Sequence, residues 1–384
     1  MIENSVAHKN KAECCGCGNC ANICPKNAIT MIADEEGYEY PSVDENLCID
    51  CGACIKKCPF EKKYLGDKHY VIESYAGRYN DEHKVKTVSS GGVCSALSES
   101  FIANGGFVYG AVYSKDYKYA TIERISDSKG IIQLKGSKYF QTIKGESVKQ
   151  IKKDLLEGRK VLFIGMPCDV AAVKRYTGEH ESLYTVDIIC SGVPSPLAHR
   201  QFIEHLEKRN GSITDFTYRR KKHGWHWPYI EAYANDKIIY SKPWSASLLG
   251  YSFKMMMRPS CYNCLYKDNR NDSDLTVGDF WGLSPKDTRY YSNGVSAIMS
   301  RSEKGEKLVT YLNGFSLFPA TYEEIANNNP KLLTCAIENS MRTKFAEQLA
   351  KEGVITACKS CMTVKDRIAN IVKIICATFN INLK

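Results

Sequence analysis

The sequence predicts two domains, a small α+β domain at its start and a larger α/β domain after it. Eight of the 18 cysteines form two regular runs within the first 60 residues. Beyond residue 80, helix-like segments alternate with buried-strand segments, which is typical of an α/β core. With 384 residues, 43% of them hydrophobic and 25% charged, the chain has the length and composition for both domains.

The two cysteine runs share one spacing, C-x2-C-x2-C-x3-C-P, at residues 14–25 and 48–59. This is the spacing of a two-cluster bacterial ferredoxin, in which the fourth cysteine of each run binds the other cluster. We therefore predict two [4Fe-4S] clusters in a domain over residues 1–62. The expected ligands are Cys14, Cys17, Cys20 and Cys58 for cluster one, and Cys48, Cys51, Cys54 and Cys24 for cluster two.

The residues around these cysteines fit a chain that wraps a cluster. Gly16, Gly18 and Gly52 can adopt the positive φ angles that such a path requires. Residues 28–32 and 38–41 are predicted to form a β-hairpin between the two runs.

The sequence also bears on whether these cysteines bind iron-sulfur clusters or zinc. No run of 18 apolar residues and no signal peptide is present, so we expect a cytoplasmic protein, in which thiols bind metal rather than form disulfides. A four-cysteine zinc site is the alternative. The repeated spacing, with a proline after each fourth cysteine, favours clusters. Cys15 falls outside the pattern and is expected to be a passive neighbour.

The rest of the chain divides by its apolar pattern. We predict a linker at 63–80, an α/β domain at 81–335 and a helical tail at 336–384. Helices are expected at 93–102, 148–157 and 170–176, strands at 106–113, 160–165 and 182–189, and further β structure at 216–240.

Four more cysteines suit a third cluster. Cys168 follows one predicted strand and Cys190 ends the next, and functional groups of α/β folds gather at strand carboxyl ends. The pair Cys261 and Cys264 cannot hold a cluster alone, but with Cys168 and Cys190 it completes a set of four thiolates.

Two further segments suggest binding less specifically. Residues 89–92, Ser-Ser-Gly-Gly, begin a predicted helix with a capping serine, and a Gly-rich helix start can hold a phosphate or simply begin a helix. The basic, aromatic residues 219–227 form either a solvated loop or a binding surface.

Charge is unevenly distributed along the chain. The first 68 residues hold 8 Lys and Arg against 11 Asp and Glu, and the remainder holds 44 Lys and Arg against 32 Asp and Glu. A basic body could attract phosphates or acidic partners; we expect no nucleic-acid partner, because no such module is legible.

Taken in order, the motifs resemble a known family. The chain resembles the beta-subunit family of coenzyme F420 hydrogenases and dehydrogenases, in the branch with a fused N-terminal dicluster ferredoxin. The motifs that carry the resemblance are the two cysteine runs and residues 89–92, 134–139, 166–168, 190–194, 261–264 and 278–282.

The resemblance implies an α+β dicluster ferredoxin head followed by an α/β flavin and iron-sulfur domain. It implies a third [4Fe-4S] cluster on Cys168, Cys190, Cys261 and Cys264, and FAD beside it. The FAD-binding positions implied are Ser90, Gly91, Gly92, Gly136, Ser137, Lys138 and Tyr139.

The implied function is an iron-sulfur flavoprotein oxidoreductase that passes electrons between a ferredoxin or other redox protein and an organic substrate of unknown identity. One alternative is an electron-transfer subunit of a larger hydrogenase- or dehydrogenase-type complex, and another is a non-flavin electron carrier or binding protein. No catalytic residue can be assigned; conceivable proton donors are His199, His223, His226, Tyr139 and Asp279.

Two features near the end stay outside this function. Cys358 and Cys361 form a CxxC without a second pair nearby, and we expect bystanders. Residues 364–379 have helical apolar spacing and basic side chains. We expect this helix to pack against the body, with contact at a membrane surface or with a partner as the alternative.

Overall fold

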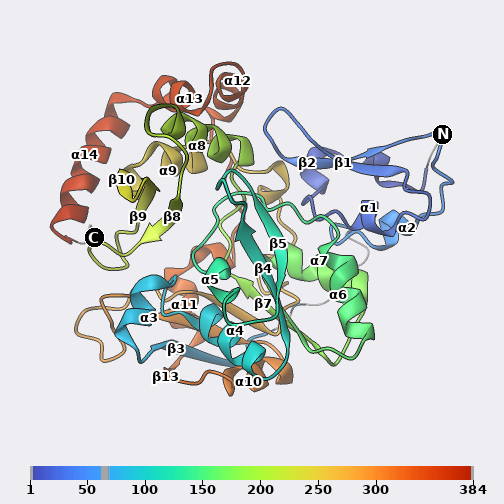
Figure 1. Ribbon diagram of the computed structural model, residues 1–384, viewed down its shortest axis with the longest axis horizontal. Helices are drawn as coiled ribbons and strands as arrows, with labels where there is room; N and C mark the ends of the chain where they lie inside the picture. Colours follow the sequence, from blue (N-terminus) through green and yellow to red (C-terminus); the bar gives the residue numbers. More distant parts are fainter. Residues whose placement is uncertain (1–2, 62–67, 69, 382–384) are drawn as a thin grey trace.

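The computed structural model describes residues 3–61, 68 and 70–381. Figure 1 shows the cysteine-rich N-terminal segment, in blue, beside α6 and α7. The last helices, in red, lie near α8 and a small sheet on the opposite side of the molecule. A large sheet lies below and between these two parts.

The N-terminal segment has the predicted hairpin and wrapped loops. Strand β1 (Ile29–Ala33) pairs antiparallel with β2 (Glu39–Val43). Helices α1 (Asn19–Ile23) and α2 (Ala53–Lys56) follow Gly18 and Gly52. Both glycines, and Gly16, have φ near +70°, as the cysteine spacing predicted.

The larger domain is built on one mixed sheet. Its central strands β11, β7, β6 and β4 run parallel, and antiparallel strands complete both edges. The described strands are ordered β13 (Phe315–Ala320), β3 (Glu73–Tyr79), β12 (Ser296–Ser300), β11 (Leu275–Asp279), β7 (Leu183–Ile188), β6 (Val161–Gly165), β4 (Phe107–Tyr113) and β5 (Ala120–Ile125).

The strand sequences explain this arrangement. The run Val161–Phe163 of β6 and all of β7 except Ile188 are buried, as expected for parallel strands covered on both faces. The predicted linker 63–80 is wrong in its second half, because residues 73–79 form β3 inside the sheet. Residues 62–67 and 69 of that linker lie outside the described residues.

Helices cover the sheet. The three expected helices correspond to α4 (Val93–Ala103), α6 (Ser147–Leu156) and α7 (Pro167–Thr177), but α4 begins after Gly92 and no serine side chain caps it. The shorter helices are α3 (Glu82–Thr87), α5 (Ile131–Leu134), α10 (Glu303–Val309) and α11 (Tyr322–Asn328). The 3-10 turns are η1 (Val6–His8), η2 (Lys11–Glu13), η4 (Trp244–Ala246), η5 (Pro259–Cys261) and η6 (Pro330–Leu332).

A second layer combines a small sheet with five helices. Strands β8 (Asp215–Arg220), β9 (Tyr229–Ala234) and β10 (Lys237–Pro243) form an antiparallel sheet. The helices are α8 (Pro196–Asn210), α9 (Leu248–Met255), α12 (Arg342–Glu352), α13 (Val354–Cys361) and α14 (Val364–Thr378). Because α12 and α13 share a hydrophobic core with α8, α9 and this sheet, most of the predicted tail is an integral part of the body.

Helix α14 does not pack against the body through its large apolar side chains. Only Cys376 and Ala377 of this helix are buried, while its large aliphatic side chains are exposed. The helix packs against the body as expected, but through Cys376, Ala377 and Lys373 and not through its large apolar side chains. No helix among the described residues is long and apolar enough to cross a membrane.

Candidate functional site: three cysteine sets

The first predicted cysteine set is assembled in the N-terminal domain. The thiols of Cys17 and Cys20 lie close enough to each other and to Cys58 to interact electrostatically. Cys14 interacts with Cys20 and Cys58 in the same way. Burial, followed by the nearby Cys14, raises the pKa of Cys20 to about 12. The last cysteine of the second run therefore lies beside the first three of the first run.

The second predicted set is assembled less tightly. Cys24 and Cys54 pack in one hydrophobic cluster with Cys20, and Cys51 interacts electrostatically with Cys54. Cys48 is half-buried on the loop before α2, and Cys51 is exposed. The backbone N–H of Ala28 donates to the Cys24 Sγ at 3.3 Å, a contact of the type that stabilises cluster thiolates.

The four cysteines of the larger domain also lie together. Cys168 stands in the first turn of α7, Cys190 follows β7, Cys261 ends η5, and Cys264 comes three residues later. The thiol of Cys261 interacts electrostatically with the other three. Burial, followed by Cys190 and Cys168, raises its pKa well above the usual range.

Polar groups around this third set suit an anionic cluster. The N–H of Val193 donates to the Cys261 Sγ at 3.3 Å, and that of Gly192 donates to the Cys190 Sγ at 3.4 Å. Burial raises the pKa of Cys190, and the nearby ammonium of Lys267, which donates to the Cys190 carbonyl oxygen, partly opposes this rise. These contacts fit thiolates that share an iron-sulfur cluster.

A zinc ion and an iron-sulfur cluster place their thiolate ligands differently. Zinc ligands surround one ion, with about 2.3 Å from metal to each sulfur. Among the described residues, no three His, Cys, Asp or Glu side chains are close enough to hold one metal ion. Cluster thiolates bind different irons, so their sulfurs stand farther apart.

A small apolar cluster connects the first and third sets. We call it the bridging cluster: its buried residues are Phe60, Ala171 and Tyr266, and its half-buried residues are Cys15, Cys58, Cys168, Cys264 and Leu265. Cys15 forms side-chain contacts with both Cys17 and Cys168. The residue outside the cysteine pattern therefore lies between the two sets.

Arg258 is a charged neighbour that sequence reasoning missed. Its side chain is 1% exposed, and it donates to the Cys14 carbonyl at 2.7 Å and to the Cys14 Sγ at 3.5 Å. Nothing in the local sequence marks it, since 244 residues separate the two partners. Lys9 is a second cation beside this set: burial raises the pKa of Cys58, and the charge of Lys9 opposes this rise.

The two segments predicted to bind the flavin contact each other, but their residues also pack against other parts of the protein. The Ser89 and Ser137 hydroxyls lie 3.1 Å apart. A Cβ at Gly91 would come within 2.1 Å of the Gly77 carbonyl oxygen, and one at Gly92 within 2.5 Å of the Tyr79 ring. These two glycines therefore allow close packing on β3.

The other predicted flavin residues are also engaged within the protein. The Ser90 hydroxyl donates to the Val295 carbonyl at 2.7 Å. The Lys138 ammonium lies within hydrogen-bond distance of four carbonyl oxygens at the end of α5, and burial lowers its pKa to about 7. Tyr139 forms a side-chain hydrogen bond with Arg219, while the space around Gly136 is open. The groups chosen for a diphosphate are already satisfied, so this segment does not fit FAD as expected.

The conceivable proton donors are placed in packed surroundings. His199 is buried, with Nδ1 2.8 Å from the Tyr218 hydroxyl and Nε2 2.7 Å from the Tyr117 carbonyl. Asp279 forms a bidentate ion pair with Arg219, both contacts being 2.8 Å.

The remaining histidines and the basic insert pack on aromatic rings. His226 stacks on Tyr290, and His223 meets Tyr229 edge-on. Trp225 of the insert is buried and stacks on Trp281, with ring centroids 4.7 Å apart. The insert is therefore partly core rather than a solvated loop.

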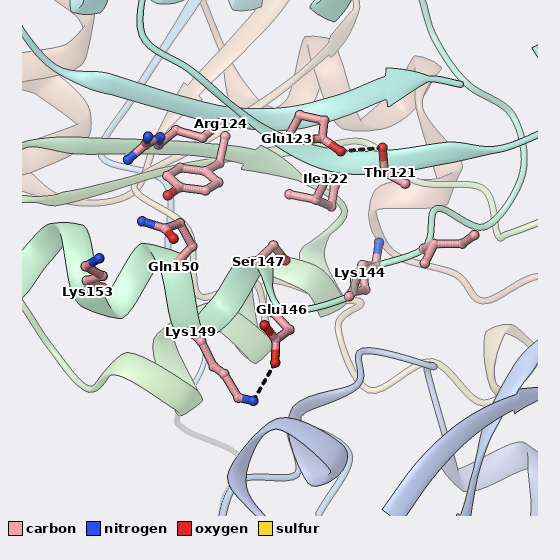
Figure 2. A pocket seen from close by; sticks show the side chains of 13 residues that line it. Thr121, Ile122, Glu123, Arg124, Lys144, Glu146, Ser147, Lys149, Gln150 and Lys153 are labelled. Atoms are coloured by element: carbon pink, nitrogen blue, oxygen red, sulfur yellow. Dashed lines mark hydrogen bonds and ion pairs between the residues drawn. The ribbon is translucent and has the colours of Figure 1, made fainter. Parts of the chain in front are cut away.

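One pocket is lined by other residues. Figure 2 shows side chains of β5, α6 and the loop between them around a cavity of about 390 Å³. Lys144, Lys149 and Lys153 line it, and Lys149 pairs with Glu146 at 2.7 Å. None of the predicted cluster or flavin residues lines this pocket.

Comparisons with known proteins agree with the two-part organisation. Residues 158–315 match the family described as the C terminus of the coenzyme F420 hydrogenase/dehydrogenase beta subunit, and residues 13–62 match the 4Fe-4S dicluster domain. An uncharacterized protein of Methanocaldococcus jannaschii is 27% identical over 191 residues, 42% of this chain and 51% of its own length.

Other relatives match the N-terminal domain. An uncharacterized ferredoxin of the same organism is 36% identical over 50 residues, 13% of this chain and 64% of its own length. NADH-quinone oxidoreductase subunit I 2 of Geobacter metallireducens is 38% identical over 61 residues, 15% of this chain and 46% of its own length. The chain thus covers less than two thirds of each of these relatives.

Among solved structures, a chain of the F420-reducing [NiFe] hydrogenase complex from Methanosarcina barkeri aligns with a TM-score of 0.47 at 18% identity. The alignment covers 77% of this chain and 92% of that chain. The two family matches stand in order along the sequence and coincide with the cysteine sets described above. Along the chain, a match to the 4Fe-4S dicluster domain is therefore followed by a match to the coenzyme F420 hydrogenase/dehydrogenase beta-subunit family, which the larger domain resembles.

Proposed function

We propose that this protein is an iron-sulfur electron-transfer subunit of a larger hydrogenase- or dehydrogenase-type complex. The observation that carries the proposal is the continuity of the three cysteine sets. Cys54 and Cys20 pack together in the N-terminal domain, and Cys58 and Cys168 meet in the bridging cluster. Each neighbouring pair of sets thus shares one packed group of residues.

The proposed ligands follow from this assembly. One [4Fe-4S] cluster is held by Cys14, Cys17, Cys20 and Cys58, a second by Cys48, Cys51, Cys54 and Cys24, and a third by Cys168, Cys190, Cys261 and Cys264. When bound, such clusters supply one-electron transfer.

The other residues of the site set its environment. Phe60 and Tyr266 keep water out between the first and third sets, with their ring centroids 5.8 Å apart. The Tyr266 hydroxyl donates to the Pro59 carbonyl and so fixes the segment after Cys58 against the larger domain. Arg258 and Lys267 place positive charge beside the first and third sets, where thiolate ligands carry negative charge.

A flavin-dependent enzyme with its own organic substrate is the second candidate. The contact between Ser89 and Ser137 favours it, because it joins the two segments that the resemblance assigned to FAD. The flavin-dependent candidate is disfavoured because Gly91, Gly92 and Lys138 already make contacts within the protein. We therefore derive no step through a flavin.

Cofactor content tests the proposal. On protein purified without oxygen, iron, acid-labile sulfide and released flavin are measured per chain. We expect about twelve irons for three clusters and no flavin. Cys190→Ser should lower the iron content to about eight, whereas Cys94→Ser, in a thiol outside the three sets, should leave it unchanged. About eight irons in the unaltered protein would refute the third cluster.

Partnership is tested separately. The tagged chain, purified from its native host under mild conditions, should bring down a catalytic subunit in constant ratio. Isolation of the chain alone, with stoichiometric flavin and turnover of an organic substrate, would replace the subunit proposal by the flavoenzyme.

A further inference from the structure

Helix α14 presents its apolar side away from the protein. Thr363 caps the helix through reciprocal hydrogen bonds with Asp366, so its start is well defined. The exposed apolar side chains on this helix and just after it are Val364, Ile368, Ile371, Val372, Ile374, Ile375, Phe379 and Ile381. Four of them share one face at the spacing i, i+4, i+7, i+11, at residues 364, 368, 371 and 375.

The opposite side attaches the helix to the body. Cys376 and Ala377 are buried there, and α14 packs against η4 and β10. The Lys373 ammonium donates to the Ser245 carbonyl, and the Trp227 indole N–H donates to the Ile381 carbonyl at 3.2 Å. Figure 1 shows the helix at the edge of the molecule, with one long side unaccompanied by any other element. The apolar side thus cannot be explained by the internal core.

The degree of exposure is large for aliphatic side chains. Val364 is 73% exposed, Ile368 and Ile371 are 59% exposed, and Phe379 is 71% exposed. A contiguous apolar surface of this kind marks an interaction site, whereas isolated exposed apolar residues do not.

Charge decides which partner fits. With 3.6 residues per turn, the exposed Lys365 and Arg367 border the apolar face on its two sides. The one acid of the helix, Asp366, is turned to the N-terminal cap. An apolar face between basic side chains suits a bilayer, since aliphatic groups enter the acyl boundary while long basic side chains reach phosphate headgroups.

We propose that this face of α14 docks on the surface of a lipid bilayer that contains anionic phospholipid. The helix lies in the plane of the interface, held by the apolar face and by Lys365 and Arg367. This attachment is separate from the cysteine sets, and it gives the electron-transfer protein a position at the membrane surface.

Vesicle binding tests the proposal on the cluster-loaded protein. Phosphatidylcholine vesicles with and without phosphatidylglycerol are sedimented with the protein. We expect the unaltered protein to co-sediment with the anionic vesicles. For the double variant Ile371→Glu and Ile375→Glu, we expect the partition coefficient to fall by a factor of about ten or more. The matched control is Leu156→Glu on α6, which is 76% exposed and should bind as the unaltered protein does.

A second variant tests the basic border. Lys365→Glu with Arg367→Glu should weaken binding to the anionic vesicles and leave iron per chain unchanged, which shows that the protein is still folded. Failure of the unaltered protein to sediment with either vesicle overturns the proposal. So does an equal loss in Leu156→Glu, or a dimer in sedimentation equilibrium that the Ile371→Glu variant dissociates while vesicles have no effect.

Discussion

The guanidinium of Arg258 lies 3.5 Å from the Sγ of Cys14, across the contact between the N-terminal domain and the body. Its other hydrogen bonds go to the carbonyls of Cys14 and Glu39 and to the Gln141 amide, none of which is a carboxylate. The guanidinium also stands over the Tyr40 ring, 4.2 Å from its centroid. A buried cation with this set of neighbours fits an anionic cluster on the nearby thiolates.

Replacement of Arg258 by Met should lower the reduction potential of one cluster of the N-terminal domain. Positive charge and a hydrogen bond to sulfur both stabilise the reduced, more negative state. We expect a shift of at least about 59 mV, a tenfold change for one electron, in a redox titration followed by electron paramagnetic resonance.

The control for this prediction is Arg289→Met. Arg289 pairs with the carboxylates of Asp287 and Glu324, whereas Arg258 contacts a cysteine sulfur. An unchanged potential in the Arg258→Met protein, at full iron content, would show that the guanidinium does not act on a cluster.

A second prediction concerns the buried ion pair of Lys144 and Asp169. The two groups are 2.9 Å apart, and their side chains are 7% and 5% exposed. Asp169→Asn removes the carboxylate that pairs with the buried Lys144 ammonium, so we expect a loss of about 3 kcal/mol or more in the free energy of unfolding, measured by anaerobic denaturant titration.

The same loop offers a matched comparison. Glu146 and Lys149 form an exposed pair, visible in Figure 2. Glu146→Gln should change the unfolding free energy by less than about 0.5 kcal/mol. Equal effects of the two substitutions would contradict the role of burial.

A third prediction concerns the connection of the two domains through Glu36 and Arg342. The carboxylate accepts two hydrogen bonds from the guanidinium, at 2.9 and 2.6 Å, and joins the β1–β2 turn to α12. Glu36→Gln should destabilise the protein by about 2 kcal/mol, seen as a lower midpoint of thermal unfolding.

Arg342→Gln should give a loss of similar size. The double variant should lose less than the sum of the two single losses, because the partners act as one unit. Glu157→Gln, in an exposed pair with Lys153 at 3.9 Å, serves as the control. Strict additivity would mean that the ion pair contributes nothing.

A fourth prediction concerns pH. Burial lowers the pKa of His199 to about 4, while the unfolded chain has a value near 6.5. Between these values only the unfolded chain takes up the proton, so this residue makes the fold less stable as pH falls from about 6.5 to 4, by about 3 kcal/mol in total.

The comparison of variants isolates this effect. His199→Gln should flatten the dependence of unfolding free energy on pH between 7 and 5, the range in which the measurement is made. His83→Gln, at an exposed position on α3, should retain it. The prediction fails if the slopes of all three proteins agree.

Local patterns predicted much of the fold. The hairpin of β1 and β2, the positive φ of Gly16, Gly18 and Gly52, and strands β4, β6 and β7 follow from spacing and apolar runs. The strand β3 was missed, because residues 73–79 belong to a sheet whose partners, β12 and β13, lie more than 200 residues later. Local periodicity carries no record of such pairing.

The sequence alone determined the dicluster domain, because the geometry of a cluster requires cysteines at short, fixed spacings that stay visible in the chain. It also pointed to four further cysteines at strand and turn ends. Their grouping into one set was expected from the sequence, but only the tertiary structure placed Cys15 between two sets and brought Arg258 to Cys14. It likewise decided that Gly91 and Gly92 serve packing and that α14 turns its apolar side outward. Such contacts join residues far apart in the chain, so they depend on how the elements pack and not on the spacing of residues along the sequence.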